Sequence, residues 1–174
     1  STYYYNIVLG SSYGGGGFYD FHAKFPDGAV INGGETQTIA LNGSDNFYAT
    51  YSVTCTYELY EDAGMPDGIP DMLEAVPGSI NDQGGFTNSG EVCILYAWDG
   101  ISDLVTDVDY FMWGDNAEGV DKTGVTINTS TYNPDTDLAL QEFMSGQHID
   151  TESWQRMDMN EGTQTTSGSN GVDG

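Results

Sequence analysis

The stretch FTNSGEVCILYAWDGISDLVTDVDYFMWGD, residues 86–115, decides the expected fold. Residues 92–98 form a short apolar run, rich in branched and aromatic side chains, which predicts a strand buried on both faces. A second β-prone run ends at residues 110–113, and Asp99 and Gly100 lie between the two runs. An Asp-Gly pair in this position predicts a β-hairpin with a type I′ turn, because both central residues of that turn need positive φ.

Alternate positions in the second arm of this hairpin differ in character. One parity holds Val105, Asp107 and Asp109, and the other holds Leu104, Thr106, Val108 and Tyr110. Side chains two positions apart share one face of a strand, so one face of this arm is expected to be largely acidic and the other mostly apolar. We therefore expect the first arm to be the central strand and the second arm to lie nearer the surface.

The composition predicts an all-β chain. With 174 residues, the chain is long enough for one domain with a sizeable core. It contains 12 Tyr and 24 Gly, and aromatic residues reach 13%. Many Tyr, Thr and Gly with few Lys, Leu and Ala are typical of short strands joined by tight turns.

The charge balance is strongly acidic, with 27 Asp and Glu and a net charge of −24. The only Lys and Arg residues are Lys24, Lys122 and Arg156. Such a chain lacks the cations that bind phosphate, which argues against nucleic acid or an anionic membrane surface as a partner. No stretch approaches the ~20 apolar residues of a membrane span, so membrane insertion is not expected either. A halophilic or marine setting and a calcium-rich extracellular one both fit.

Further strands are expected along the chain, with turns at residues 26–28 and 32–35. They are residues 1–9, 29–31, 36–41, 120–127 and 153–159, with another aromatic-rich segment at 47–60. Residues 61–85 contain several prolines and glycines and predict a long loop with one helical turn at 71–75. Residues 161–174 are rich in Gly, Ser and Thr and predict an irregular tail.

Cys55 and Cys93 are the only cysteines, which is compatible with one disulfide between them. Two unpaired buried cysteines are the alternative, because free cysteine is often buried. Neither cysteine belongs to a C-x-x-C or Cys/His cluster, so a zinc site is not predicted. The chain begins at Ser1 without a methionine or a signal peptide, so we expect a processed or truncated product.

Short pieces of this sequence carry a family resemblance. They are FPDG at 25–28, GE at 34–35, IAL at 39–41, YELY at 57–60, TNSGE at 87–91, LY at 95–96, DG at 99–100, DVDY at 107–110, WGD at 113–115, SWQR at 153–156 and EGT at 161–163. Together they resemble bacterial secreted proteins that carry a lamin-tail-like domain. The resemblance covers most of residues 25–174 and implies an immunoglobulin-like β-sandwich with long loops over residues 1–160. The family usually has two further upstream strands, which this chain lacks.

The best candidate for a metal site is the stretch DAGMPDGIPD, with Asp62, Asp67 and Asp71 as ligands. Calcium takes oxygen ligands from closely spaced carboxylates, and glycine permits a tight loop around the ion. The stretch resembles thrombospondin-type calcium repeats, although Ala63 and Met65 stand where those repeats have acids. The incomplete ligand set favours the alternative, a solvated acidic loop braced by prolines.

No catalytic motif is present, and we expect that the protein is not an enzyme. His22 and His148 are the only histidines, and neither lies in a recognisable nucleophile or metalloprotease motif. Asp99, Asp103 and Asp107 form a weaker acidic cluster, which the solubility of the hairpin explains equally well.

The aromatic residues have two interpretations. Exposed rings stack on sugars in carbohydrate-binding modules, whereas rings at strand spacing are more often core residues or cross-strand pairs. The candidates for sugar stacking are Tyr3, Tyr4, Tyr5, Phe18, Tyr19, Phe47, Tyr48 and Trp154.

These patterns favour a non-catalytic extracellular or cell-surface module that acts by protein–protein contact, plausibly within a surface or filamentous assembly. Its partner would be a second copy of itself or another surface protein. The first strand is the expected assembly strand, through Tyr3, Tyr4, Tyr5, Ile7, Val8 and Leu9. A sandwich without the two upstream strands of the family has an exposed sheet edge, which can recruit residues 1–9 of another chain. The alternative is that residues 1–9 pair within their own sheet. The alternative function is a calcium-stabilised carbohydrate-binding accessory module of a secreted hydrolase.

Overall fold

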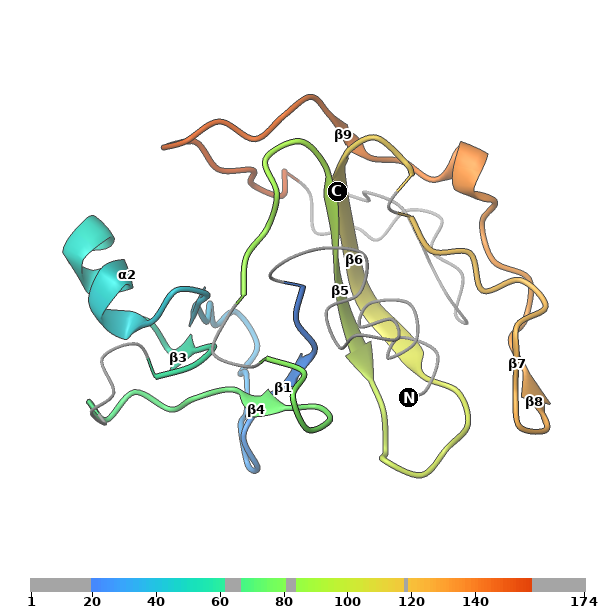
Figure 1. Ribbon diagram of the computed structural model, residues 1–174, viewed down its shortest axis with the longest axis horizontal. Coiled ribbons are helices and arrows are strands. Elements are labelled where there is room, and N and C mark those ends of the chain that lie inside the picture. The colour runs from blue at the N-terminus through green and yellow to red at the C-terminus, as the bar shows by residue number, and fades with distance from the viewer. Residues whose placement is uncertain (1–19, 62–66, 81–83, 118, 158–174) are drawn as a thin grey trace. The chain divides into compact units, whose positions relative to one another are not determined.

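The computed structural model describes residues 20–61, 67–80, 84–117 and 119–157 (Figure 1). These residues divide into two compact units between Phe86 and Thr87. We call residues 20–86 the N-terminal unit and residues 87–157 the C-terminal unit. The described part of the chain is rich in short strands with little helix, which confirms the strand-rich class. An immunoglobulin-like sandwich over residues 1–160 stays a prediction, and the tail at 161–174 lies outside the described residues.

Two small sheets and one helix are formed by the described residues of the N-terminal unit. Its elements are β1 (Ala23–Lys24), β2 (Ile39–Ala40), α2 (Ser44–Tyr51), β3 (Tyr57–Glu58) and β4 (Leu73–Glu74). Strand β1 pairs with β4 in antiparallel fashion, and β2 pairs with β3 in parallel. The core of the unit consists of Tyr57, Leu59, Met72 and Ile80.

Turns in the N-terminal unit agree with the sequence better than its strands do. Ala29 donates its backbone N–H to the carbonyl of Pro26 at 3.0 Å, and Glu35 does the same to Asn32 at 2.9 Å, which confirms both turns. Residues 29–31 form no strand, because they pair with no neighbour among the described residues. The expected helical turn at 71–75 is also wrong, since that segment supplies β4.

Helix α2 was not expected, because its sequence SDNFYATY has no clear apolar stripe. Glycine and serine bound the helix through left-handed backbone positions that end regular structure. Gly43 precedes it with φ of 79°, and Ser52 ends it with φ of 58° and donates its N–H to the carbonyl of Tyr48 at 2.8 Å. The first N–H of the helix, on Ser44, is bound by a side chain of β3 rather than by a local cap.

The C-terminal unit is built on the expected hairpin, now seen as β5 (Glu91–Ala97) and β6 (Thr106–Gly114) in antiparallel pairing. Its other elements are β7 (Thr126–Ile127), β8 (Ser130–Thr131), the short 3₁₀ helix η2 (Leu138–Leu140) and β9 (Met144–Ser145). Strand β9 adds to β6 in parallel, so β6 is the central strand of a three-stranded sheet and β5 is an edge. The expected order of the two arms is therefore wrong.

Two further details of the hairpin differ from the sequence-based expectation. Side chains of β5 alternate between partly buried and exposed, so this strand is not buried on both faces. The connection runs through residues 98–105 instead of a two-residue turn. The Asp99 carboxylate stabilises this longer loop by accepting the N–H groups of Ile101 at 2.9 Å and Ser102 at 2.7 Å.

A β-bulge in β6 separates the two acids that were expected on one face. Leu95 pairs with Asp109, but the next residue, Tyr96, pairs with Asp107, so Val108 is an extra residue in β6. One residue of slip turns a side chain to the opposite face. Asp107 therefore lies on the face opposite to Asp109.

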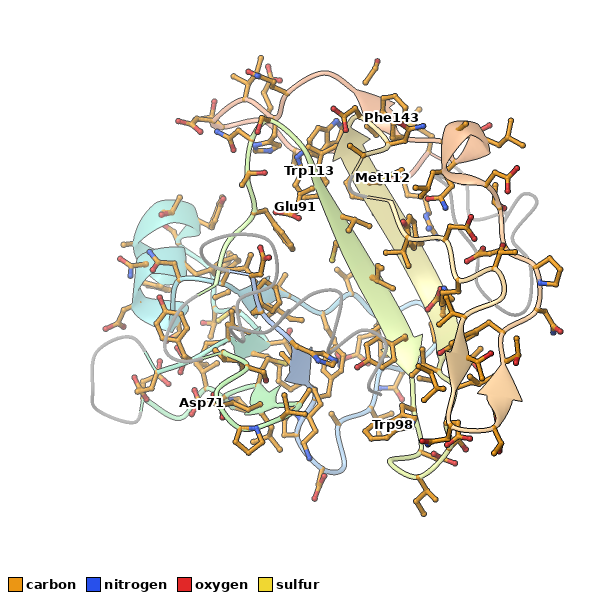
Figure 2. All side chains as sticks on the ribbon, turned by 45° about the vertical axis from the view of Figure 1, so that its right-hand side comes forward. Asp71, Glu91, Trp98, Met112, Trp113 and Phe143 are labelled. Carbon is orange, nitrogen blue, oxygen red and sulfur yellow. The ribbon has the colours of Figure 1, made fainter. Side chains whose placement is uncertain are left out.

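The two faces of β6 carry different side chains. Tyr110 and Met112 are buried on one face, and Phe111 and Trp113 lie on the other. Figure 2 shows Met112 and Trp113 pointing to opposite sides of the strand.

Both acids of β6 bind a cation, so the expected acidic surface face does not form. Lys122 is fully buried and forms ion pairs with Asp107 and with Asp135, the latter at 3.6 Å. On the opposite face, Arg156 pairs with Asp109 at 2.7 Å. Residues 120–127 supply only β7, and residues 153–157 form no strand.

Candidate binding site

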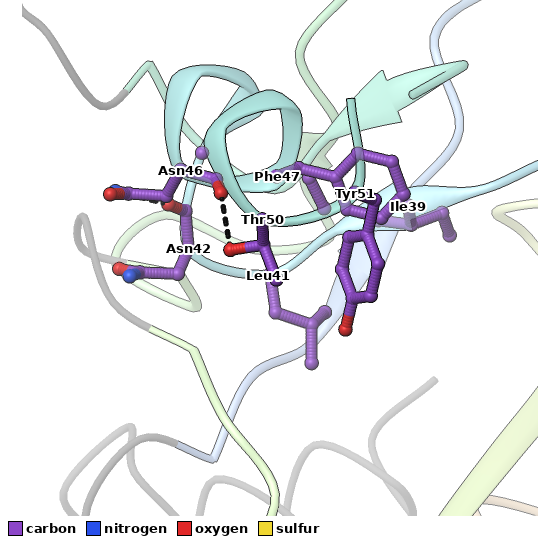
Figure 3. A pocket seen from close by; sticks show the side chains of 9 residues that line it. Ile39, Leu41, Asn42, Asn46, Phe47, Thr50 and Tyr51 are labelled. Carbon is purple, nitrogen blue, oxygen red and sulfur yellow. Dashed lines mark hydrogen bonds between the residues drawn. The ribbon is translucent and has the colours of Figure 1, made fainter. Parts of the chain in front are cut away.

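Helix α2 and the segment before it form an open groove with a volume of about 340 Å³ in the N-terminal unit. Ile39 and Leu41 give it an apolar part, and Phe47 and Tyr51 supply aromatic rings from adjacent turns of α2 (Figure 3). The two ring centroids lie 4.8 Å apart. We call this feature the α2 groove.

Amide side chains line the polar part of the α2 groove. Asn46 donates its amide to the backbone carbonyl of Asn42 at 2.8 Å. The hydroxyl of Thr50 donates to the backbone carbonyl of Asn46 at 2.9 Å, as the dashed line in Figure 3 shows. The amide oxygen of Asn42 accepts the hydroxyl of Tyr60 at 3.0 Å. The hydrogen bonds of the Asn42 and Asn46 side chains hold these amides in place, so the groove presents fixed polar groups together with two aromatic rings tilted by 49° to each other.

Three carboxylates gather beside Ser44, at the first turn of α2. Ligand oxygens of Glu58, Glu61 and Asp67 all lie within 4.8 Å of one another. We call these three residues the carboxylate cluster. Glu58 has an exposed fraction of 0%, Glu61 is partly buried and Asp67 is exposed.

Ser44, the first residue of α2, connects the helix to the carboxylate cluster. Its backbone N–H donates to Glu58 Oε2 at 2.8 Å, and its hydroxyl donates to Asp67 Oδ2. Burial raises the pKa of the Glu58 carboxyl, and the hydrogen bonds from Ser44 offset part of that rise. The hydrogen bond from Ser44, followed by the N–H of Ile69, lowers the pKa of Asp67.

Two oxygens of the carboxylate cluster have no hydrogen-bond partner among the described residues. They are Glu58 Oε1 and Glu61 Oε1, and both atoms are buried. Native proteins satisfy nearly all buried polar atoms, so such oxygens point to a ligand or to a cost in stability. No Lys or Arg of the described chain forms an ion pair with any of the three acids.

Of the expected metal ligands Asp62, Asp67 and Asp71, the structure describes the last two and brings Asp67, but not Asp71, into this cluster. Asp67 belongs to it, whereas Asp62 lies outside the described residues. Asp71 forms a backbone bridge with Glu58 but is exposed and contributes no ligand to the cluster (Figure 2). Glu58 and Glu61 were not predicted as ligands, although an acid inside the aromatic segment TYELY, residues 56–60, is a signal of a buried polar group.

The second acidic cluster expected from the sequence does not form. Asp99 binds its own loop, and Asp103 accepts hydrogen bonds from Asn128 at 2.7 Å and from Ser130 at 2.9 Å. Asp107 binds Lys122. Each acid therefore has its own partner, and no grouping of potential metal ligands includes them in the described part of the chain.

The expected disulfide between Cys55 and Cys93 is absent from the structure, where both are free thiols. Cys55 is buried in the N-terminal unit, and Cys93 is exposed on β5 of the C-terminal unit. The expectation rested on the cysteine count, which does not constrain the geometry that a disulfide requires.

The other candidate residues fall in several places. Trp154 packs against Phe111, Trp113 and His148, with ring centroids 4.9 to 5.5 Å apart. This position fits a packing role better than sugar stacking. The stretch from Tyr3 to Leu9, together with Phe18 and Tyr19, lies outside the described residues.

The two histidines differ in environment. Burial lowers the pKa of His22 to about 4. A nitrogen of the His148 ring lies 2.8 Å from the carbonyl oxygen of Glu152.

No protein family model, no curated protein and no solved structure matches this chain. The lamin-tail resemblance therefore stays a prediction. Among the described residues, no helix is both long and apolar enough to cross a membrane.

Proposed function

We propose that the chain is a non-catalytic extracellular or cell-surface module that works by contact, and that the α2 groove binds neutral carbohydrate. The observation that carries this proposal is the combination of two aromatic rings, the exposed Tyr51 and the partly buried Phe47, with held side-chain amides in one open groove. It corresponds to the class of carbohydrate-binding accessory modules of secreted hydrolases.

The chemistry of the α2 groove fits a sugar. Flat aromatic rings stack on the apolar face of a pyranose, while amides bind its hydroxyl groups. Phe47 and Tyr51 supply rings, and Asn42 and Asn46 supply amides. A net charge of −24 opposes an anionic ligand, which favours a neutral saccharide over an acidic one.

Tyr51→Ala is expected to weaken saccharide binding on the order of 10-fold, because it removes a ring from the groove. The matched control is Tyr48→Ala on the same helix. Tyr48 is 59% exposed and Tyr51 is 63% exposed, but only Tyr51 lines the groove. A neutral-glycan array identifies the saccharide, and calorimetry then compares the two variants. Absence of any bound glycan, or equal losses in both variants, contradicts the proposal.

A second candidate function is assembly into a surface or filamentous structure by strand addition. Strand β5 is favoured as the acceptor, because it lies at the edge of its sheet and β6 is its strand neighbour among the described residues. The edge of a sheet offers backbone donors and acceptors to another chain. The donor would be residues 1–9 of a second copy.

Deleting residues 1–9 tests the assembly. The truncated chain is expected to remain folded and to lose association in sedimentation velocity, most clearly at high salt, where repulsion between acidic copies is screened. Unfolding of the truncated chain, or a full-length chain that is monomeric at every salt concentration, contradicts strand exchange.

A further inference from the structure

We propose that the carboxylate cluster of Glu58, Glu61 and Asp67 is a calcium site that ties β3 to the start of α2. The proposal concerns a different site from the α2 groove and does not depend on sugar binding. Of the ligands proposed from the sequence pattern it keeps Asp67 and omits the exposed Asp71, and it adds two glutamates.

The spacing of the three carboxylates fits one ion. Calcium binds oxygen at ~2.3–2.6 Å, so two ligands on opposite sides of it lie up to about 5 Å apart. Ligand oxygens of the cluster all lie within 4.8 Å of one another. One calcium ion can therefore contact all three side chains without rearrangement of the backbone.

The buried oxygens supply an independent reason for a cation. Glu58 is fully buried, and its Oε1 atom has no hydrogen-bond partner among the described residues. The buried Oε1 atom of Glu61 also has no hydrogen-bond partner among the described residues. A buried carboxylate is destabilising unless it is paired or coordinates a metal. A bound cation would coordinate both oxygens and would also reduce the electrostatic repulsion among the three acids.

The donor set selects the class of ion. All three ligands are carboxylates, which are hard oxygen donors suited to calcium, magnesium or manganese. Magnesium requires near-ideal octahedral geometry at ~2.0–2.1 Å, whereas calcium accepts irregular shells of six to eight oxygens. A set of three acids with unequal burial, one on β3 and two beyond it in the chain, suits the more tolerant ion.

The consequence of binding would reach α2 through Ser44. Glu58 accepts the N–H of Ser44 at 2.8 Å, and Asp67 accepts its hydroxyl. Ser44 begins the helix that carries Phe47 and Tyr51. An ion that fixes the two carboxylates would therefore also fix the first turn of α2.

Calorimetric titration of the full chain with calcium chloride, without any saccharide, tests the site. We expect one calcium site, weaker binding of magnesium, and a thermal midpoint that rises with calcium more than with sodium chloride of matched ionic strength. Glu58→Gln is expected to weaken calcium binding on the order of 10-fold or more, since it removes a ligand charge. The matched control is Asp71→Asn, an exposed acid outside the cluster, which is expected to retain the wild-type affinity.

The thermal midpoint measured in chelator, without calcium, distinguishes a change in calcium affinity from a change in folding stability. Glu58→Gln is expected to raise the thermal midpoint in chelator, because it removes a buried charge, and to abolish the further rise with calcium. Equal calcium affinity in wild type and Glu58→Gln, loss of binding in Asp71→Asn, or magnesium binding as tight as calcium overturns the assignment. Measuring calcium binding by Tyr51→Ala distinguishes this site from the α2 groove, because that variant is expected to bind calcium as wild type does.

Discussion

Replacing Lys122 with methionine is expected to destabilise the C-terminal unit by about 3–5 kcal/mol. The ammonium group is fully buried between Asp107 and Asp135, whose side chains are also almost completely buried. Removing one partner of a buried ion pair leaves the remaining charge without compensation. Here two carboxylates would lose their cation at once, so the loss is expected near the upper end of that range.

Tryptophan fluorescence during urea unfolding measures this loss. All three tryptophans, Trp98, Trp113 and Trp154, belong to the C-terminal unit, so their signal reports on that unit. Lys24→Met is the matched control, because Lys24 is exposed and forms no ion pair among the described residues. Equal unfolding free energies for the two variants would contradict the buried network. Adding Asp107→Asn to Lys122→Met should recover part of the lost stability.

His22 is expected to make the N-terminal unit lose about 3 kcal/mol of stability as the pH falls from 6.5 to 4. Its pKa is about 4 in the folded chain, against an ordinary value of 6.5, because burial disfavours the charged ring. Between these two values the unfolded chain binds more protons, so its population grows as the pH falls. The contribution of neutral His22 to the free energy of unfolding is therefore fully present above pH 6.5 and is lost as the pH falls toward 4.

His22→Gln isolates this effect, because glutamine does not titrate. The backbone of His22 keeps its bonds in the variant: its N–H donates to Ser79 at 2.9 Å, and its carbonyl accepts the N–H of Ala75 at 3.0 Å. Cys55 is buried in the same unit, so its labelling by dithiodipyridine in a Cys93→Ser background reports unfolding there. If wild type and His22→Gln lose stability in parallel between pH 7 and 4, the histidine is not the cause.

Local signals in the sequence predicted one hairpin and two turns correctly, but not helix α2 or the strand at 71–75. The hairpin of β5 and β6 follows from two β-prone runs, and the turns at 26–28 and 32–35 follow from their glycines. Gly28 and Gly34 have φ of 84° and 79°, a conformation that glycine adopts readily. These features depend on neighbours along the chain, which the sequence displays directly.

Features set by distant partners could not be predicted. Strand β6 is central because β9, which lies far along the chain, pairs with it. The sequences of the two strands contain no signal that predicts this pairing. The bulge at Val108 moved Asp107 and Asp109 to opposite faces, although their spacing placed them on one. Helix α2 has weak amphipathic character, and its start depends on Glu58, which lies on another element.

The candidate metal site shows the same limit. Asp67 was predicted because it lies in a glycine- and proline-rich acidic loop, where spacing along the chain is informative. Glu58 and Glu61 come from β3 and the residues after it, and only the fold brings them to Asp67. Their burial and their unpartnered oxygens are properties of the fold, which spacing alone does not encode.

In our proposal, one cation organises the start of α2 and thereby the surface that makes contact. Amide hydrogen exchange of the full chain, with calcium and with sodium chloride of equal ionic strength, tests it most directly. Protection is expected to rise at Ser44–Tyr51 and at Tyr57–Glu58 with calcium alone, and to stay unchanged at Thr106–Gly114 in the other unit. Unchanged exchange in α2, or equal protection of both units by either salt, would contradict the claim, because charge screening would then explain the whole effect.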